Sequence, residues 1–409
     1  MLNGFAQHLP SIRAQPPMKT VLLAWELGGG MGHITTLRRL ARSLRLLNLR
    51  IVAAVKDLEA AHLLSSDGIE IIQAPVWPSA SMSARQIAAT SSASMGDILA
   101  TAGLSDAAGL RGLLGAWDNV LLRFKPDLVV SHLAPAVALV TRGRVPLILV
   151  GDGYTLPPDG IRQFPSLHAM TPPGDEAVIL DVLNGVLRAR SETRLDHLPQ
   201  IFSGDARLVL TFPLLDPYFA LRTEPLLGPV LDHVPVAAVP KERSVFVYLS
   251  RGYPLHRDIP AALSAHGPGL RIHAPDLPER QMGDLMRAGA VVDRDFAAPA
   301  DALKSAALVV HFGGSGLAAE ALMAGIPQLI LSMQIEQWLN GLALQSAGLG
   351  RVIEAFNPAT RITSEIDSLL EDTAIVRAAA DAGRLHRELL SRTDALATFE
   401  STCRGLLAI

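Results

Sequence analysis

The chain has 409 residues, 49% of them hydrophobic, which is enough for two domains with sizeable cores. Its net charge of −3 and lack of a basic block argue against nucleic acid as the main partner. No apolar run approaches the roughly 18–20 residues of a transmembrane helix. The single cysteine, Cys403, excludes a disulfide framework and a cysteine-based zinc site and favours a cytoplasmic protein.

Residues 1–18 are expected to be a disordered leader, because they contain no continuous apolar core. Short apolar runs then alternate with helical stretches, and runs without polar alternation are typical of buried parallel strands. The first series comprises Val21–Trp25, Ile51–Val55, Ile69–Ile72, Leu128–Val130 and Leu147–Val150. Between the first two strands we expect a helix, Leu37–Leu47, with a solvated face made of Arg38, Arg39, Arg42 and Arg45.

A glycine-rich loop, Trp25–His33, follows the first strand and opens the first helix. Gly28, Gly30 and Gly32 suggest a dinucleotide fingerprint at first sight. The two-residue gap before the third glycine is missing, so a dinucleotide site is the weaker interpretation.

Residues 75–118 and 152–175 fit no strand series, and long connections at the carboxyl ends of strands usually line a site. Plain surface loops are the alternative. A Pro-rich linker, 226–240, then leads to a second series made of Val245–Leu249, Arg271–His273, Val291–Val292, Leu308–Val310 and Gln328–Leu331. The pattern predicts an α/β protein with two doubly wound domains, 19–225 and 241–409, facing a central cleft.

Residues 308–340 are the most informative stretch of the chain. A buried strand leads into the turn Gly313–Gly316 and a helix start, whose free N–H groups and positive helix end suit a diphosphate. Glu320 follows one helical turn later, where a carboxylate reaches a ribose, and Glu336 and Gln337 follow the next strand. A lone glycine-rich turn otherwise reflects tight packing. Together these residues suggest a nucleotide with a polyhydroxylated group attached.

This arrangement resembles the donor-sugar signature of GT-B glycosyltransferases of the UDP-glycosyltransferase and macrolide-glycosyltransferase type. The matching residues are His311, Gly313, Glu320, Gly325, Pro327, Glu336, Gln337 and Asn340. One position departs from the pattern, because the family's phosphate-binding His falls on Phe312. Either the turn carries one extra residue, or His311 takes the role from the adjacent position, although neighbouring strand positions normally point oppositely.

The resemblance covers the chain from about Lys19. It implies a GT-B fold of two Rossmann-like domains whose final helices, from about Ala374 to Leu407, cross back to the first domain. It also implies an inverting hexosyltransferase that moves a sugar from a UDP- or TDP-sugar to a small-molecule acceptor. Asp293 and Asp295 are two residues apart, but they lie where the family recognises the base and not by a phosphate. No His/Asp cluster with ligand spacing occurs, so we expect neither a metal nor a cofactor besides the nucleotide-sugar co-substrate. The sequence leaves open whether the protein forms a homo-oligomer.

By the same resemblance, the donor lies on the second domain. The backbone of Gly314, Ser315 and Gly316 would hold the diphosphate, Glu320 the ribose, and Glu336 with Gln337 the sugar hydroxyls. Arg251 lies where the family has a Gly-Ser pair against the diphosphate, and it would clamp a phosphate unless it faces solvent. Phe296 would flank the base unless it packs in the core.

The turn of Gly30, Met31, Gly32 and His33 resembles the first loop of the family, whose glycines make room for substrate on the acceptor side. In relatives that glycosylate hydroxyls, a His at this point deprotonates the acceptor. An imidazole that titrates near neutrality suits this role. His33 is therefore the candidate base.

The family often orients this His with an Asp, which is missing here. Its usual position holds Ser131, with His132 beside it. Asp152, after the next strand, or Glu26 is the expected replacement, although either carboxylate would equally bind acceptor or cap a helix. Two rivals to the transferase therefore stay open: a nucleotide-sugar epimerase or hydrolase on the same scaffold, and a non-catalytic partner subunit of a glycosyltransferase.

Overall fold

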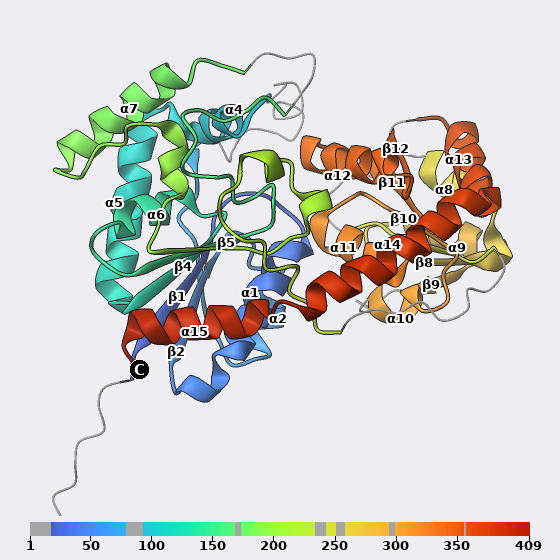
Figure 1. The fold of residues 1–409 in the computed structure, drawn as a ribbon, viewed down its shortest axis with the longest axis horizontal. Helices are drawn as coiled ribbons and strands as arrows, with labels where there is room; N and C mark the ends of the chain where they lie inside the picture. The colour runs from blue at the N-terminus through green and yellow to red at the C-terminus, as the bar shows by residue number, and fades with distance from the viewer. Residues whose placement is uncertain are drawn as a thin grey trace, which may run out of the picture.

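The computed structural model describes residues 18–78, 93–167, 173–233, 243–250, 258–293, 299–355 and 357–409. These residues form two α/β domains, each built on one parallel sheet (Figure 1). The strand order is β3-β2-β1-β4-β5-β6 in the first sheet and β9-β8-β7-β10-β11-β12 in the second. Both orders are those of a doubly wound nucleotide-binding domain. The predicted fold class is therefore confirmed.

The first sheet contains β1 (Thr20–Trp25), β2 (Arg50–Val55), β3 (Glu70–Gln73), β4 (Leu128–His132), β5 (Leu147–Gly151) and β6 (Ala206–Val209). Its helices include α1 (Met31–Ser43), α2 (His62–Ser65), α4 (Met95–Leu99), α5 (Ala107–Phe124), α6 (Pro135–Thr141) and α7 (Glu176–Ala189). Alternate residues of β1 pack into separate cores, Leu22 with Trp117 of α5, and Leu23 with Leu37 of α1. Since both faces of the sheet are covered, the central strands are apolar throughout.

The second sheet contains β7 (Val245–Tyr248), β8 (Leu270–His273), β9 (Val291–Asp293), β10 (Leu308–His311), β11 (Gln328–Ser332) and β12 (Gly350–Glu354). Its helices include α8 (Asp258–Ser264), α9 (Glu279–Arg287), α10 (Pro299–Leu303), α11 (Ser315–Ala324), α12 (Ile335–Ser346), α13 (Ala359–Glu371) and α14 (Thr373–Ser391). The last strands of the two sheets, β6 and β12, lie outside the series expected from the sequence.

The chain connects the two domains at more than one place. Phe212 and Leu215, which precede the expected boundary at residue 225, pack in the core under α11 of the second domain. The last helix, α15 (Ala395–Leu407), returns to the first domain, where Phe399 and Cys403 pack in the core beside β1 and β4 (Figure 1). Apolar side chains buried at both crossings hold the two domains together.

The expected solvated face of arginines is only partly present, because Arg45 is exposed but Arg38, Arg39 and Arg42 are half-buried. The helix begins at Met31, six residues earlier than expected, and a short 3-10 turn follows it at Arg45–Leu47. Arg38 and Arg42 of the helix and Arg45 of the turn bond the buried carboxylate of Asp67 at 2.6–2.8 Å. Burial alone would raise the pKa of Asp67, but hydrogen bonds from Arg42 and Arg38 hold it well below its usual range.

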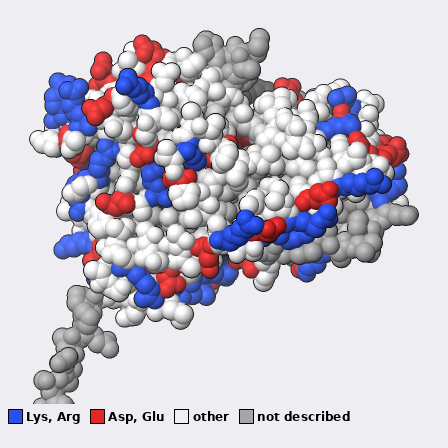
Figure 2. Space-filling model, viewed as in Figure 1, with Lys and Arg blue, Asp and Glu red and all other residues white. Residues whose placement is uncertain are grey.

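Some of the residues discussed from the sequence lie outside the described ranges, namely Arg251, Phe296, residues 1–17 of the expected leader and residues 234–240 of the expected linker. Within the described ranges, no helix is long and apolar enough to cross a membrane. Figure 2 shows charged side chains of both signs scattered over one face of the molecule. Along α14 they form neighbouring ion pairs, such as Asp381 with Arg384 and Glu388 with Arg392.

Candidate active site

The turn between β10 and α11 lies where the strand order of the second sheet reverses, the usual ligand position in doubly wound domains. Gly313 has a φ of 93°, and a Cβ there would lie 2.7 Å from Ile330 Cγ2, so this tight turn requires glycine. Gly314 is the N-cap of α11 and provides no side-chain cap. The first N–H groups of α11, including that of Gly316, have no acceptor within the helix. The helix end therefore offers donors to an anion.

Glu336 of α12 lies at this helix end. The Oγ of Ser315 donates to Oε1 of Glu336 at 3.0 Å, and the Ser315 main-chain N–H also bonds the carboxylate. Asn340 Nδ2 donates to the Gly313 carbonyl oxygen at 2.9 Å and so fixes the turn. The adjacent Gln337 is buried, and its Oε1 accepts from Met333 N–H at 2.8 Å. The structure thus brings the turn, the carboxylate and the amides together.

Glu336 is influenced by a residue of the first domain. Burial, followed by the negative charge of Asp152, raises the pKa of Glu336 to about 8, against the hydrogen bonds from Ser315. At neutral pH the carboxyl group is therefore mostly protonated. A neutral carboxyl group at the N-terminus of α11 does not repel a diphosphate, and it both donates and accepts hydrogen bonds with hydroxyls.

Glu320 lies on α11 with its side chain buried. Its Oε1 is 3.6 Å from Nη2 of Arg39, which belongs to α1 of the first domain. Its Oε2 is buried and has no hydrogen-bond partner among the described side and main chains. Burial raises the pKa of Glu320, and the Arg39 charge opposes that rise. A buried oxygen without a donor is the acceptor that a ribose hydroxyl would satisfy.

His311 points into the second domain. Its Nδ1 accepts from Gly313 N–H at 3.1 Å, and its Nε2 lies 2.9 Å from Gln328 Oε1, an acceptor. The side chain is buried, and burial lowers its pKa to about 4, so the ring is neutral. Both ring nitrogens are engaged inside the protein. In this arrangement His311 supports the Gly313 turn and offers no nitrogen to a phosphate; the adjacent Phe312 is buried as well.

His33 lies in the first turn of α1, at the reversal of strand order in the first sheet. Its ring is half-buried and stacks on Trp25 with a centroid distance of 5.0 Å. Gly28 has a φ of 78°, and a Cβ there would lie 2.5 Å from His33 Nε2, so only glycine leaves room for the ring. Gly30, with a φ of 87°, is the N-cap of α1. The half-buried Met31 and the exposed Gly32 follow it.

The residue that contacts His33 is His132, the last residue of β4. Nδ1 of His33 and Nε2 of His132 lie 3.0 Å apart, and Nδ1 of His132 is 3.1 Å from the Val150 carbonyl oxygen. Burial, followed by the charges of His132 and Lys56, lowers the pKa of His33 well below its usual range. From the sequence, His132 stood out only as a neighbour of Ser131. Its place at the carboxyl end of a central strand was the available signal.

Neither carboxylate proposed to orient His33 does so by contact. Glu26 accepts from Ala136 N–H, Val137 N–H and Trp77 Nε1 at 2.7–2.9 Å, so it caps α6. Asp152 Oδ1 accepts from the N–H and the Oγ1 of Thr155, both at 2.8 Å, so it closes its own loop. The expected direct orientation is thus wrong for both, because His132 occupies the position beside the ring. Asp152 acts on His132 only through its charge.

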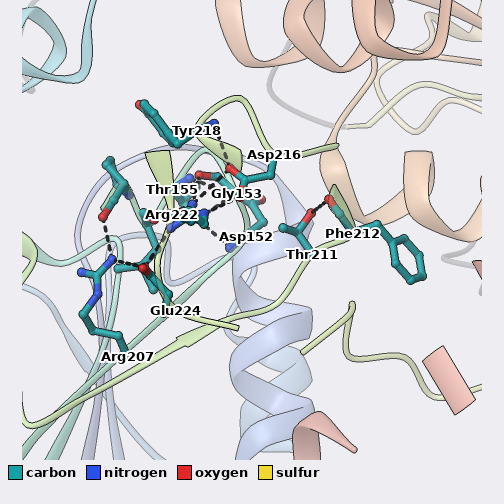
Figure 3. A network of polar contacts seen from close by, with 12 residues as sticks. Asp152, Gly153, Thr155, Arg207, Thr211, Phe212, Asp216, Tyr218, Arg222 and Glu224 are labelled. Atoms are coloured by element: carbon teal, nitrogen blue, oxygen red, sulfur yellow. Dashed lines mark hydrogen bonds and ion pairs between the residues drawn. The ribbon is translucent and has the colours of Figure 1, made fainter. Parts of the chain in front are cut away.

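The loop that carries Asp152 is held by a buried ion pair (Figure 3). Arg222 pairs with Asp216, and their side chains are 2% and 0% exposed. The same guanidinium donates to the carbonyl oxygens of Gly153 and Leu156 at 2.8 and 2.9 Å. The loop between β5 and α7 is therefore positioned from the segment that leads to the second domain. Within the described parts of the chain, no three His, Cys, Asp or Glu side chains are grouped to hold a metal ion.

Residues 276–395, which include the turn Gly313–Gly316, match the family model described as Erythromycin biosynthesis protein CIII-like, C-terminal domain. No curated protein matches the chain in sequence. Among solved structures, the chain is similar to the calicheamicin glycosyltransferase CalG4, with a TM-score of 0.67 and 17% identity over 96% of this chain and 98% of that one.

Two further structures add bound molecules to the comparison. The spinosyn rhamnosyltransferase SpnG, complexed with spinosyn aglycone, gives a TM-score of 0.64 at 18% identity over 94% of this chain and all (100%) of that chain. The glycosyltransferase VinC in complex with DTDP gives a TM-score of 0.62 at 14% identity, over 95% of this chain and 99% of that chain. The chain therefore has the GT-B fold of natural-product glycosyltransferases, and the resemblance inferred from the donor motif is confirmed. Its C-terminal part matches the erythromycin CIII-like domain.

Proposed function

We propose that the protein transfers a hexose from a UDP- or TDP-sugar to a hydroxyl group of a small-molecule acceptor, with inversion and without a metal ion. The observation that carries this proposal is the 3.0 Å contact between Ser315 Oγ and Glu336 Oε1. It places a carboxyl group and neighbouring amides at a helix end with free N–H donors. A helix end binds phosphate, and carboxyl and amide groups bind sugar hydroxyls.

On the donor side, the N–H of Gly316 and the positive end of α11 hold the diphosphate, with Ser315 at the edge. These donors stabilise the negative charge that grows on the leaving diphosphate, which is the task a metal performs in other sites. The free Oε2 of Glu320 accepts from a ribose hydroxyl. Glu336 and Gln337 bind hydroxyls of the transferred sugar. The family match over residues 276–395 and the DTDP complex of VinC support this assignment.

On the acceptor side, His33 is the base. Its Nε2 lies over the side-chain-free position of Gly28, and Gly30, Met31 and Gly32 border the acceptor. Arg39, on the same helix as His33, lies 3.6 Å from Glu320 of α11, so the acceptor side faces the proposed donor residues. Base and leaving-group residues come from different domains, an arrangement that allows attack from the face opposite the diphosphate. The aglycone complex of SpnG supports a small-molecule acceptor.

The test is mass spectrometry of products from UDP- and TDP-hexoses combined with a panel of hydroxylated small molecules. A conjugate of sugar and acceptor, with release of the nucleoside diphosphate, is the expected result. Free sugar or an isomerised donor formed without any acceptor would identify a hydrolase or an epimerase instead. Tight nucleotide binding without turnover on any acceptor would identify a non-catalytic subunit.

A further inference from the structure

The proton positions of the His33–His132 pair follow from the main chain. A carbonyl oxygen only accepts, so the 3.1 Å contact with Val150 O requires the proton of neutral His132 on Nδ1. Nε2 of His132 then carries a lone pair. Because His33 Nδ1 lies 3.0 Å from this nitrogen, it must be the donor. The other nitrogen of His33, Nε2, is left unprotonated.

We propose that His132 is a positioning residue for the base: a neutral imidazole, anchored on the Val150 carbonyl, holds His33 in the tautomer whose Nε2 accepts the acceptor's proton. This inference rests on the proposed function. As the acceptor oxygen bonds to the anomeric carbon, its proton passes to Nε2 of His33. The bond from that carbon to the diphosphate oxygen breaks, and its electron pair leaves with the diphosphate.

The surroundings of the pair fix the direction of the ring. Trp25 stacks on His33 at an interplanar angle of 21°, and the His132 ring lies against it with a centroid distance of 4.9 Å. Nε2 lies against the backbone of Gly28, where a Cβ would come within 2.5 Å of it. The charged groups that act on the pair are Lys56, near His33, and Asp152, near His132.

A neutral imidazole beside His33 affects the pKa of this base differently from a carboxylate in the same place. After Nε2 accepts a proton, the His33 cation keeps its hydrogen bond to His132 but gains no opposite charge beside it. A carboxylate in that place would favour the cation and raise the pKa of the base. If His132 itself were protonated, its Nε2 would donate to His33 Nδ1 and force the His33 proton onto Nε2, which would abolish the base. The pair therefore loses activity on taking up a single proton.

The tautomer can be measured in the free protein, independently of any sugar transfer. In protein labelled with ¹⁵N-histidine at pH 8, we expect the His33 signals, assigned by their loss in His33→Gln, to show a protonated Nδ1 and an unprotonated Nε2. His132, assigned by its loss in His132→Phe, should also carry its proton on Nδ1. A proton on Nε2 of His33 in the wild type would overturn the proposal.

The activity test compares pH profiles of kcat/KM. His132→Asp should move the acid limb of the profile upward by about one unit or more, because a carboxylate favours the imidazolium. His132→Phe should lower kcat about 100-fold with the donor KM within about twofold, since proton transfer, not binding, is lost. An unchanged acid limb in His132→Asp contradicts the proposal.

His386 is the matched control, because it is also a buried histidine with Nδ1 on a carbonyl oxygen, that of Ala382 at 2.7 Å. His386→Phe should change thermal stability without moving the pH profile. The base assignment has its own test: His33→Ala with full turnover would refute the base and leave the measured tautomer unaffected. An error in the proposed reaction and an error in the His132 role are thus distinguishable.

Discussion

The guanidinium of Arg39 lies 3.6 Å from the carboxylate of Glu320, so the helix that carries the candidate base is paired with the helix of the candidate phosphate site. Arg39 is itself held by Asp232 Oδ2 at 3.0 Å and by the Val230 carbonyl oxygen at 2.7 Å. One oxygen of Glu320 faces this arginine, and the other has no donor among the described groups. The contact between the domains thus involves the same carboxylate that we propose to bind a ribose.

Replacing Arg39 with Gln removes the cation beside this buried carboxylate. We expect a loss of about 2 kcal/mol in the free energy of unfolding, because a buried charged acceptor is left without its partner. Urea unfolding at pH 7 measures it. The control is Arg384→Gln, whose pair with Asp381 is 67% exposed on both sides and should matter by less than about 0.5 kcal/mol. Equal losses in the two variants would mean that the Arg39–Glu320 pair contributes no more than an exposed pair.

Affinity for UDP or TDP should fall as pH rises through about 8. Glu336, with its pKa raised to about 8, is neutral below this pH and ionised above it, where its charge repels the diphosphate. We expect a loss of about three- to tenfold between pH 7 and 9, a range in which a phosphate with a second pKa near 6 does not titrate. Isothermal titration calorimetry measures the affinity.

Glu336→Gln is the control for this pH dependence and should give a flat profile between pH 7 and 9. Asp152→Asn should move the midpoint to lower pH, because a negative charge that raises the pKa of Glu336 is removed. A slope in Glu336→Gln equal to that of the wild type would assign the effect to another group.

Gly313→Ala should destabilise the protein by about 2 kcal/mol or more, since the residue has a φ of 93° and the new Cβ would lie 2.7 Å from Ile330 Cγ2 and 3.0 Å from the Gln337 carbonyl oxygen. Thermal unfolding gives the change. Gly405→Ala in α15, where a Cβ has open space, should instead gain about 0.5–1 kcal/mol. A tolerated Ala at 313 would show that the turn is not as tight as described.

Arg222→Met should cost about 3–5 kcal/mol, because it leaves the carboxylate of Asp216 buried without a cation. The Asp152 loop loses its anchor at the same time, since Arg222 also binds the carbonyl oxygens of Gly153 and Leu156. Chemical denaturation measures the cost, and hydrogen exchange of residues 152–156 measures the loosening of the loop. Unchanged hydrogen exchange in these residues would show that the ion pair does not hold the loop in place.

The central strands and the glycine-rich turn after β10 could be predicted from the sequence because their signals are local. Strands covered on both faces are apolar throughout, and Ser315 and Glu336 follow the neighbouring parallel strands β10 and β11, whose carboxyl ends meet at one edge. The strands β6 and β12 escaped prediction because they are edge strands that carry polar residues such as Arg207 and Arg351.

The contacts of His33 and Arg39 could not be predicted in the same way. His33 and His132 are 99 residues apart, and no periodicity or spacing relates them. The arginines of α1 have the spacing of an exposed helix face, but Asp67 and Glu320 reach them from distant segments. A motif predicts which residues of one loop lie together, whereas contacts between loops depend on how the sheets and domains pack.

The whole proposal depends on the N-terminus of α11, with Glu336 beside it, binding a nucleoside diphosphate. Isothermal titration of UDP and TDP into the wild type and Ser315→Pro tests it most directly. Proline fits the first helical position behind the extended Gly314, and it removes both the N–H and the hydroxyl group of residue 315. We predict micromolar binding by the wild type, on the order of 1–100 μM, and at least about tenfold weaker binding by the variant. No binding to the wild type, or equal binding to a folded Ser315→Pro protein, would contradict the account.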